Sequence, residues 1–277
     1  MAVRIDASGE HYSQATTFDG ATCTITCWAR IDVDRNTFSS AWNIDDGTNA
    51  LQLQTNSDGV TWMIFDTGSG ITDLFAATVG VWYFIAVVKD SNPSGTKAYW
   101  ATATEDALNT GTSTHSVSAS MNNLMIGESV AGGEWLNGSI AAVKIWQGVT
   151  LTQAEIENER FQYLPHRTAN LYAFYPFLEG GTGAGAKQDF SGNGNTLSGG
   201  TNSATTDGPP IPWRRSFRQI FGGAEAAPPP PEGGYYLNED DVDRFLLEDG
   251  SGVLILEETF PPLVPLIGRR PNGLVRM

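Results

Sequence analysis

One stretch decides the fold of this 277-residue chain: WLNGSIAAVKIWQGVTLTQAEIENE, residues 135–159. Its first half is apolar and rich in β-branched and aromatic residues, and it predicts a strand over residues 139–146. Its second half predicts a helix over residues 151–160. Thr152 can cap the start of this helix, and Glu155, three residues later, completes a capping box. The stretch therefore predicts a strand that leads directly into one short, capped helix.

The other segments before residue 207 predict strands alone. They are rich in Val, Ile, Thr and aromatic residues, and turn signals such as DDG, SDG, TGSG, NPSG and AGG separate them. A spacing of about 8–12 residues between strands favours an all-β sandwich or jelly roll. The further predicted strands are residues 22–31, 51–54, 61–65, 82–89, 97–104 and 123–126.

Charge and composition exclude several classes of function. The formal charge of −15 makes the chain a poor general binder of nucleic acid or of anionic membranes. No apolar run reaches about 18 residues and the first residues have no apolar core, so we expect neither membrane insertion nor a secretion signal. Cys23 and Cys27 fall on one face of a strand, roughly 13 Å apart, which is too far for a disulfide. We expect both to be buried thiols.

Composition changes sharply near residue 207. Eleven of the 14 prolines lie at 209 or later, whereas seven of the eight tryptophans lie before. We therefore expect one domain over residues 1–207, a Pro/Gly-rich linker over 208–234 and an attachment arm over 235–277. Within the arm, RFLLEDGSGVLILEE (244–258) predicts a β-hairpin.

A lone two-stranded hairpin is marginal in water, so we expect the arm to dock on a partner, by strand addition or in a groove. The arm's basic residues are all Arg, which suits contacts with charged partner surfaces. The predicted partner-binding residues are Phe245, Leu246, Leu247, Val253, Leu254, Ile255, Leu256, Phe260, Leu263, Leu266, Arg269 and Arg270.

Several segments resemble the laminin-G-like, concanavalin-A-like jelly-roll family. They are ATCTITCWARID (21–32), GVWYFIAVVKD (80–90), NNLMIGE (122–128) and the stretch quoted first. NLYAFYPFLEGGTGAGAKQDFSGNGNTLSGG (170–200) resembles the family's opening segment but here comes last. First and last strands of a sandwich are commonly neighbours, so we expect this piece in the same place in space. The resemblance implies an all-β jelly-roll sandwich with one short helix, and the extended Pro-rich arm with its hairpin lies outside the match.

The resemblance also implies a ligand segment at DFSGNGN, residues 189–195. Asp189, Asn193 and Asn195 offer oxygens of the kind that Ca²⁺ takes, and family members often hold a structural Ca²⁺ near this segment. The alternative is a Gly/Asn turn in which Asp189 bonds its own backbone. The family's acid pair is Ala141–Ala142 here, and this departure favours the turn. We expect no other cofactor.

Glycan binding is the further function that the family implies. Sugar rings stack on exposed aromatic side chains, and turns supply polar partners. The tryptophans nearest to loops or strand ends are Trp42, Trp62, Trp100 and Trp135, and these are the candidate glycan-binding residues. For each of them, packing in the core is the alternative, because Trp is highly buried on average.

Glycoside hydrolysis is the least favoured of the candidate functions. Related glucanases carry a strand of the form E-x-D-x-x-E, which places two carboxyls about 5–10 Å apart. No such strand occurs in residues 1–207, where the acids fall in predicted turns or on the short helix. We therefore expect that the chain is not an enzyme.

The combination of a jelly roll with an extended arm resembles virion structural proteins of tailed bacteriophages. We therefore expect a capsid decoration or cement protein, anchored by its arm to other virion proteins such as the major capsid protein. Homo-oligomers on the particle and host glycans are further expected partners, and assembly would take place in the host cytoplasm. A glycan-binding adhesin module of a tail or fibre is the alternative.

Overall fold

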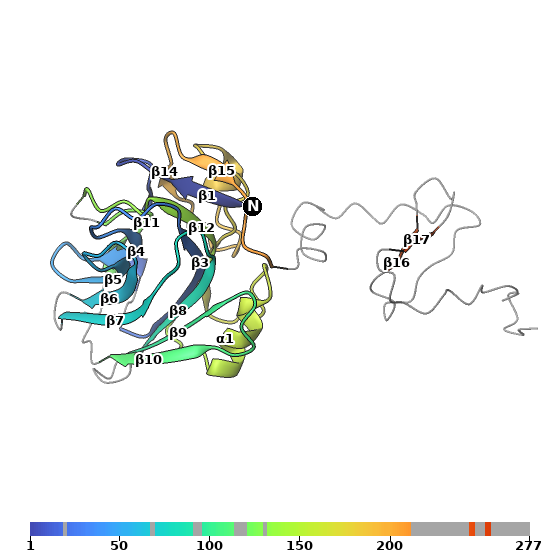
Figure 1. Ribbon diagram of the computed structural model, residues 1–277, viewed down its shortest axis with the longest axis horizontal. Helices are drawn as coiled ribbons and strands as arrows, with labels where there is room; N and C mark the ends of the chain where they lie inside the picture. Colours follow the sequence, from blue (N-terminus) through green and yellow to red (C-terminus); the bar gives the residue numbers. More distant parts are fainter. Residues whose placement is uncertain are drawn as a thin grey trace, which may run out of the picture. The chain divides into compact units, whose positions relative to one another are not determined.

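The computed structural model describes residues 1–18, 21–66, 70–90, 96–113, 121–129, 132–211, 244–246 and 253–255. The chain divides into two units, 1–221 and 222–277, and each is described by itself. Within the first unit, two antiparallel sheets pack face to face into a jelly-roll sandwich (Figure 1). The prediction of an all-β sandwich is confirmed.

The first sheet, sheet A, has eight strands in the described residues, with β12 at its centre. β13 (Leu171–Tyr175) pairs with β12 beside the path of the other seven. Those seven follow in spatial order: β10 (Asn109–Ser113), β9 (Thr96–Thr102), β8 (Tyr83–Lys89), β3 (Cys23–Ile31), β12 (Gly138–Gln147), β1 (Ala2–Ile5) and β15 (Ala204–Thr206).

The second sheet, sheet B, has seven strands in the described residues. Their spatial order is β14 (Ser198–Gly199), β2 (Tyr12–Phe18), β11 (Met121–Ile126), β4 (Ser40–Asp45), β5 (Ala50–Thr55), β6 (Thr61–Asp66) and β7 (Gly70–Ala76).

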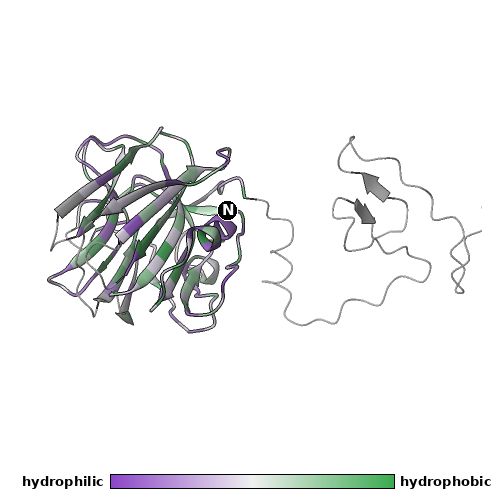
Figure 2. Ribbon diagram, turned by 90° about the horizontal axis from the view of Figure 1, so that it is seen from below, coloured by the Kyte–Doolittle hydropathy of each residue, from purple (hydrophilic) through white to green (hydrophobic). Residues whose placement is uncertain are grey.

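The hydrophobic core lies between the two sheets, and strand alternation fills it. On β3, Cys23, Ile25 and Cys27 point into this core, whereas Trp28 points to the outer face of sheet A. Figure 2 shows hydrophilic and hydrophobic residues mixed along the strands, as this alternation requires. Cys23 and Cys27 are buried and free, which confirms the expectation of two buried thiols.

A bulge in β12 adjusts which side chains face the core. The pairing of β12 with β3 shifts register between Ala141 and Lys144, and Ala142 has the left-handed φ of 48°. As a result, Ile140 and Val143 both point into the core, while the two alanines pack on the outer face. Small side chains suit these two positions because the outer face is itself covered.

That cover is helix α1 (Gln153–Arg160) and the chain that follows it (Figure 1). The predicted capping box is confirmed: Thr152 accepts from the Glu155 N–H, and the Glu155 carboxylate accepts from the Thr152 N–H. Ile156 packs with Trp146 in a second apolar cluster, on the outer face of sheet A. Sheet A is therefore buried on both of its faces.

A buried ion pair fixes the helix to the sheet. Lys144 of β12 lies 2.7 Å from a carboxylate oxygen of Glu159, and both side chains are at most 2% exposed. The ammonium also donates to the backbone carbonyls of Glu159, Gln162 and Leu164. Burial lowers the pKa of Lys144, and the Glu159 carboxylate opposes this effect.

The segment that comes last in the domain completes both sheets. β13 extends sheet A beside β12, β14 extends sheet B beside β2, and β15 pairs with β1. Packing continues as far as Ile211, which is 3% exposed against the outer cluster of sheet A. The prediction that the late segment lies beside the first strands is confirmed. These short strands, together with β1, β2, β4, β7 and β10, were not predicted from the sequence.

The predicted hairpin of the arm is also present. β16 (Arg244–Leu246) and β17 (Val253–Ile255) pair antiparallel, with Phe245 opposite Leu254. Two short α-helices occur in the described residues, α1 and α2 (Ala184–Lys187), against the single helix predicted. Neither of them has the length or apolar character that a membrane crossing requires.

Replacing one partner of the buried ion pair is expected to destabilise the domain strongly. Lys144→Met leaves the Glu159 carboxylate buried without its counter-charge, which costs about 3–5 kcal/mol in the free energy of unfolding. Denaturant titration of the full chain measures this loss. The double variant Lys144→Met/Glu159→Leu removes both charges and is expected to recover much of it. A single variant as stable as the wild type would contradict the assigned role of the pair.

Candidate ligand-binding hollow

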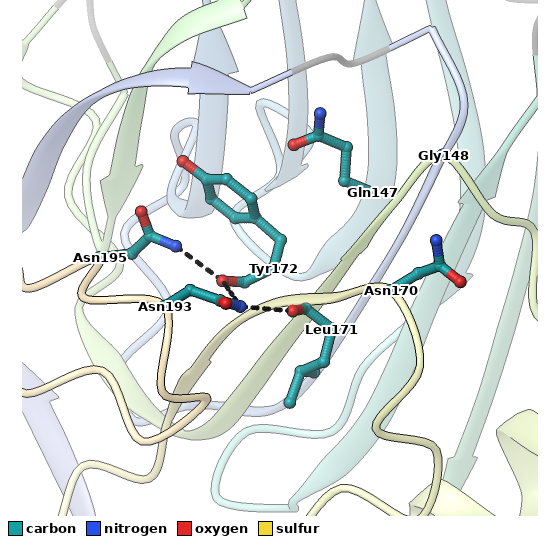
Figure 3. Close-up of a pocket in the computed structure, with 7 residues that line it drawn as sticks. All are labelled: Gln147, Gly148, Asn170, Leu171, Tyr172, Asn193 and Asn195. Carbon is teal, nitrogen blue, oxygen red and sulfur yellow. Dashed lines mark hydrogen bonds between the residues drawn. The ribbon is translucent and has the colours of Figure 1, made fainter.

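An open hollow of about 460 Å³ lies where the end of β12 meets the start of β13 and the turn after α2 (Figure 3). Four of its residues carry side-chain amides and one is a tyrosine. The lining residues are Gln147, Gly148, Asn170, Leu171, Tyr172, Asn193 and Asn195. Asn193 and Asn195 belong to the ligand segment expected from the sequence, whereas the other five lie in segments quoted for the fold and were not proposed as ligand-binding residues.

The DFSGNGN turn that forms one wall is organised by the buried carboxylate of Asp189. One of its oxygens accepts from the backbone N–H groups of Phe174 and Ser191, at 3.0 and 2.8 Å. The other accepts from the Ser191 hydroxyl and the Asn195 N–H, at 2.8 and 2.9 Å. The bond to Phe174 ties the turn to β13. This arrangement is the Asx-type turn given above as the alternative to a metal site.

The two asparagines clamp the turn onto β13. The Asn193 amide donates to the carbonyls of Leu171 and Tyr172, at 2.7 and 3.1 Å (Figure 3). The Asn195 amide donates to the Tyr172 carbonyl at 2.7 Å, and its oxygen accepts from Gln14 at 3.1 Å. Gly192 and Gly194 of this turn adopt positive φ angles, which lets the turn double back within a few residues.

Asp189, Asn193 and Asn195 do not fit a calcium site. A hard cation needs several converging oxygens, yet both oxygens of Asp189 and the side-chain oxygen of Asn195 already accept hydrogen bonds. Across the described ranges, no cluster of three or more His, Cys, Asp or Glu side chains is placed to hold a metal ion. The three residues therefore do not support a structural calcium at this segment: they build the turn that was given as the alternative, and Asn193 and Asn195 line the hollow.

The polar groups available to a ligand are those that make no hydrogen bond within the wall of the hollow. Neither the side-chain amides of Gln147 and Asn170 nor the Tyr172 hydroxyl has a hydrogen-bond partner in the described part of the protein. Asn170 reaches its position through a left-handed backbone, with φ of 64°. The Tyr172 ring packs edge-on against Phe18, 5.3 Å between centroids.

The Tyr172 hydroxyl stays protonated over the physiological range. Burial raises the pKa of this group, and the negative charge of Asp189 raises it further. A protonated phenol both donates and accepts, as do the amides around it. The hollow thus offers both hydrogen-bond donors and hydrogen-bond acceptors, all of them neutral.

Two of the tryptophans proposed as glycan contacts lie in the core. Trp42 on β4 and Trp62 on β6 are 0% exposed and belong to the cluster between the sheets. The sequence analysis put Trp42 near a loop because it did not predict strand β4. Trp62 lies on a predicted strand, β6, but its side chain points inward. Neither can stack on a sugar from solvent, and these two assignments are corrected.

The other two tryptophans are partly buried and already in aromatic or cationic contacts. Trp100 on β9 stacks on Phe75 of β7, with 5.1 Å between centroids and an interplanar angle of 11°. Trp135 lies under the guanidinium of Arg35, 3.5 Å from the ring centroid. Both pack against the core cluster. Neither lines the hollow.

The chain belongs to the concanavalin A-like lectin/glucanases superfamily. The family model matches residues 6–157, which is more than half of the chain and includes strands of both sheets. The family resemblance inferred from the sequence is therefore confirmed. Comparison with the sequences of curated proteins finds no match.

Solved structures of several kinds are similar to this chain at low identity. A heptameric SAP-like pentraxin from Limulus polyphemus is 14% identical, with 53% of this chain and 73% of that one covered and a TM-score of 0.40. The enzymatically active domain of tailspike protein 2 from bacteriophage CBA120 is 12% identical, with 63% and 31% covered and a TM-score of 0.45. Domains LG4-5 of the mouse laminin α1 chain are 11% identical, with 55% and 43% covered and a TM-score of 0.37. This chain thus spans less than a third of the tailspike domain and less than half of the laminin pair.

One variant tests both the role of Asp189 in the turn and the calcium assignment. Asp189→Ala removes four hydrogen bonds from a buried wall of the hollow and is expected to cost about 1–3 kcal/mol of unfolding free energy or more. Addition of Ca²⁺ or of EDTA is expected to leave the Tm of the wild-type chain unchanged. A rise in Tm with Ca²⁺ that Asp189→Ala abolishes would restore the calcium assignment.

Proposed function

We propose that the domain is a non-enzymatic carbohydrate-binding module whose ligand site is the hollow. The observation that carries this proposal is the set of unpartnered neutral groups on Gln147, Asn170 and Tyr172. Membership of a superfamily that is named for lectins and glucanases supports it.

The chemistry of the hollow suits sugar hydroxyls. A hydroxyl group donates once and accepts twice, and the amide and phenol groups supply both kinds of partner. Binding sites of small molecules combine apolar walls with a few placed polar groups, and Leu171 and the Tyr172 ring supply apolar surface here. The hollow is open, which favours the end or one unit of a glycan over an enclosed small ligand.

Glycoside hydrolysis finds no support at this site. The reaction needs two carboxyl groups on opposite sides of the scissile bond, about 5–10 Å apart. The seven lining residues include no Asp and no Glu. Asp189, the nearest acid named above, lies 6% exposed and uses both oxygens within the turn.

A glycan array probed with the full chain, followed by titration of the strongest ligand, tests the proposal. Asn170→Gly keeps the left-handed backbone and removes the amide, while Tyr172→Phe removes only the hydroxyl. We expect the double variant to bind about tenfold more weakly, because two hydrogen bonds are lost. Asn202→Gly is the matched control, since Asn202 is also exposed with a left-handed φ of 67°. Absence of binding by the wild type, or equal affinities of variant and control, would overturn the proposal.

We further propose that the chain is a virion structural protein, such as a capsid decoration or cement protein, attached through its arm. The paired strands β16 and β17 support this role, because an isolated two-stranded hairpin gains stability by docking on another protein. The major capsid protein and further copies of this chain are the proposed partners, and the apolar and Arg residues of the arm named above are the proposed contacts. Many weak contacts on a repeating lattice add up to firm attachment.

Truncation of the chain tests whether the arm attaches it to the particle. A tagged chain that ends at Ile211 keeps the packing of the domain and removes the hairpin. In cells that assemble the particle, we expect the full chain to co-purify with particles and the truncated chain to remain free. Equal incorporation of both chains, measured by quantitative blotting of gradient-purified particles, would refute attachment through the arm.

A further inference from the structure

Two asparagines of the described residues are followed directly by glycine: Asn137 by Gly138, and Asn193 by Gly194. In such a pair the glycine nitrogen can attack the Cγ atom of the asparagine, which closes a five-membered succinimide and releases ammonia. Water then opens the ring. One asparagine and one water thus give one aspartate or isoaspartate and one ammonia. Glycine favours this deamidation because it has no side chain to hinder its nitrogen and has great conformational freedom.

The fold encloses the first of these pairs. Gly138 is buried at the start of β12, where it pairs with Ile31 of β3 on one side and with Ile5 of β1 on the other. A Cβ atom at this position would collide with the carbonyl oxygen of Arg30, so the neighbouring backbone packs closely against the glycine. A succinimide at Asn137 would therefore require the centre of sheet A to open.

The second pair lies in open surroundings. Asn193 and Gly194 are both exposed, and a Cβ atom added to Gly194 would meet no atom within 4 Å. Among the described residues, the Gly194 N–H donates no hydrogen bond. The Asn193 amide is held by its bonds to the carbonyls of Leu171 and Tyr172 (Figure 3). Its reaction therefore requires two hydrogen bonds at the surface to open, and no strand pairing is lost.

We propose that Asn193 is a site of spontaneous deamidation, and that the reaction disables the hollow which Asn193 lines. A carboxylate has no hydrogen to donate, so both bonds to the carbonyls of β13 are lost and a negative charge faces two carbonyl oxygens. Isoaspartate also lengthens the main chain by one carbon before Asn195. This displaces the N–H that bonds Asp189 and the amide that bonds Tyr172. The effect on binding rests on the proposed function, whereas the modification does not.

Ageing of the purified full chain at mildly alkaline pH, followed by peptide mass spectrometry, tests the modification. We expect the Asn193 peptide to gain the mass difference between amide and carboxyl and to contain isoaspartate, while the Asn137 peptide stays unchanged. In denaturant both peptides are expected to react, because the fold no longer protects Asn137. Gly194→Asn is the matched variant, since Asn tolerates a positive φ and its side chain slows the attack. An unmodified Asn193, or equal rates at Asn137 and Asn193 in the folded chain, would overturn the proposal.

Asn193→Asp represents the reacted protein and tests the consequence. We expect a Tm lower by a few degrees and about tenfold weaker binding of the oligosaccharide selected on the array, because two hydrogen bonds are lost. Asn202→Asp is the control, because it places the same charge at another exposed asparagine. Equal Tm values or equal affinities of the two variants would refute the disabling of the hollow. If the wild type binds no glycan, the proposed function fails, while the mass change and the Tm still decide the modification and the loss of the clamp.

Discussion

The fold depends on the burial of sheet A on both faces. One face meets sheet B across the main core, and the other is covered by α1 and the chain after it, held by the Lys144–Glu159 ion pair. A sheet with two covered faces leaves little surface for polar side chains, although Arg4 of β1 and Lys97 of β9 are exposed. The candidate hollow lies at the end of β12, beside the start of β13, rather than on that covered face.

Much of this architecture was predicted from the sequence, because it rests on local signals. The capping box of α1, the central strand β12 and the hairpin of the arm each depend on a few residues close together. Several of the strands that were not predicted, such as β1, β14 and β15, are short. Trp42 shows the consequence. Because β4 was not predicted, this core residue was assigned to the neighbourhood of a loop.

The candidate site was predicted only in part. Asn193 and Asn195 were named from the sequence, but as candidate metal ligands, because their side-chain oxygens occur at alternating positions. The direction of their hydrogen bonds, with nitrogens turned towards the carbonyls of β13, depends on the folded position of that strand. Gln147 and Tyr172 carry no motif, and they meet at the hollow through the pairing of β12 with β13. Sites assembled from isolated polar residues of distant segments leave little trace in a sequence.

The late position of β13, β14 and β15 has a consequence for the order of folding. During synthesis the chain up to α1 emerges first, with the edges of β12, β1 and β2 still unpaired. β13, which covers part of the edge of β12, also supplies Leu171 and Tyr172 to the hollow. Coverage of the edge of β12 and completion of the hollow therefore arise together, when β13 pairs.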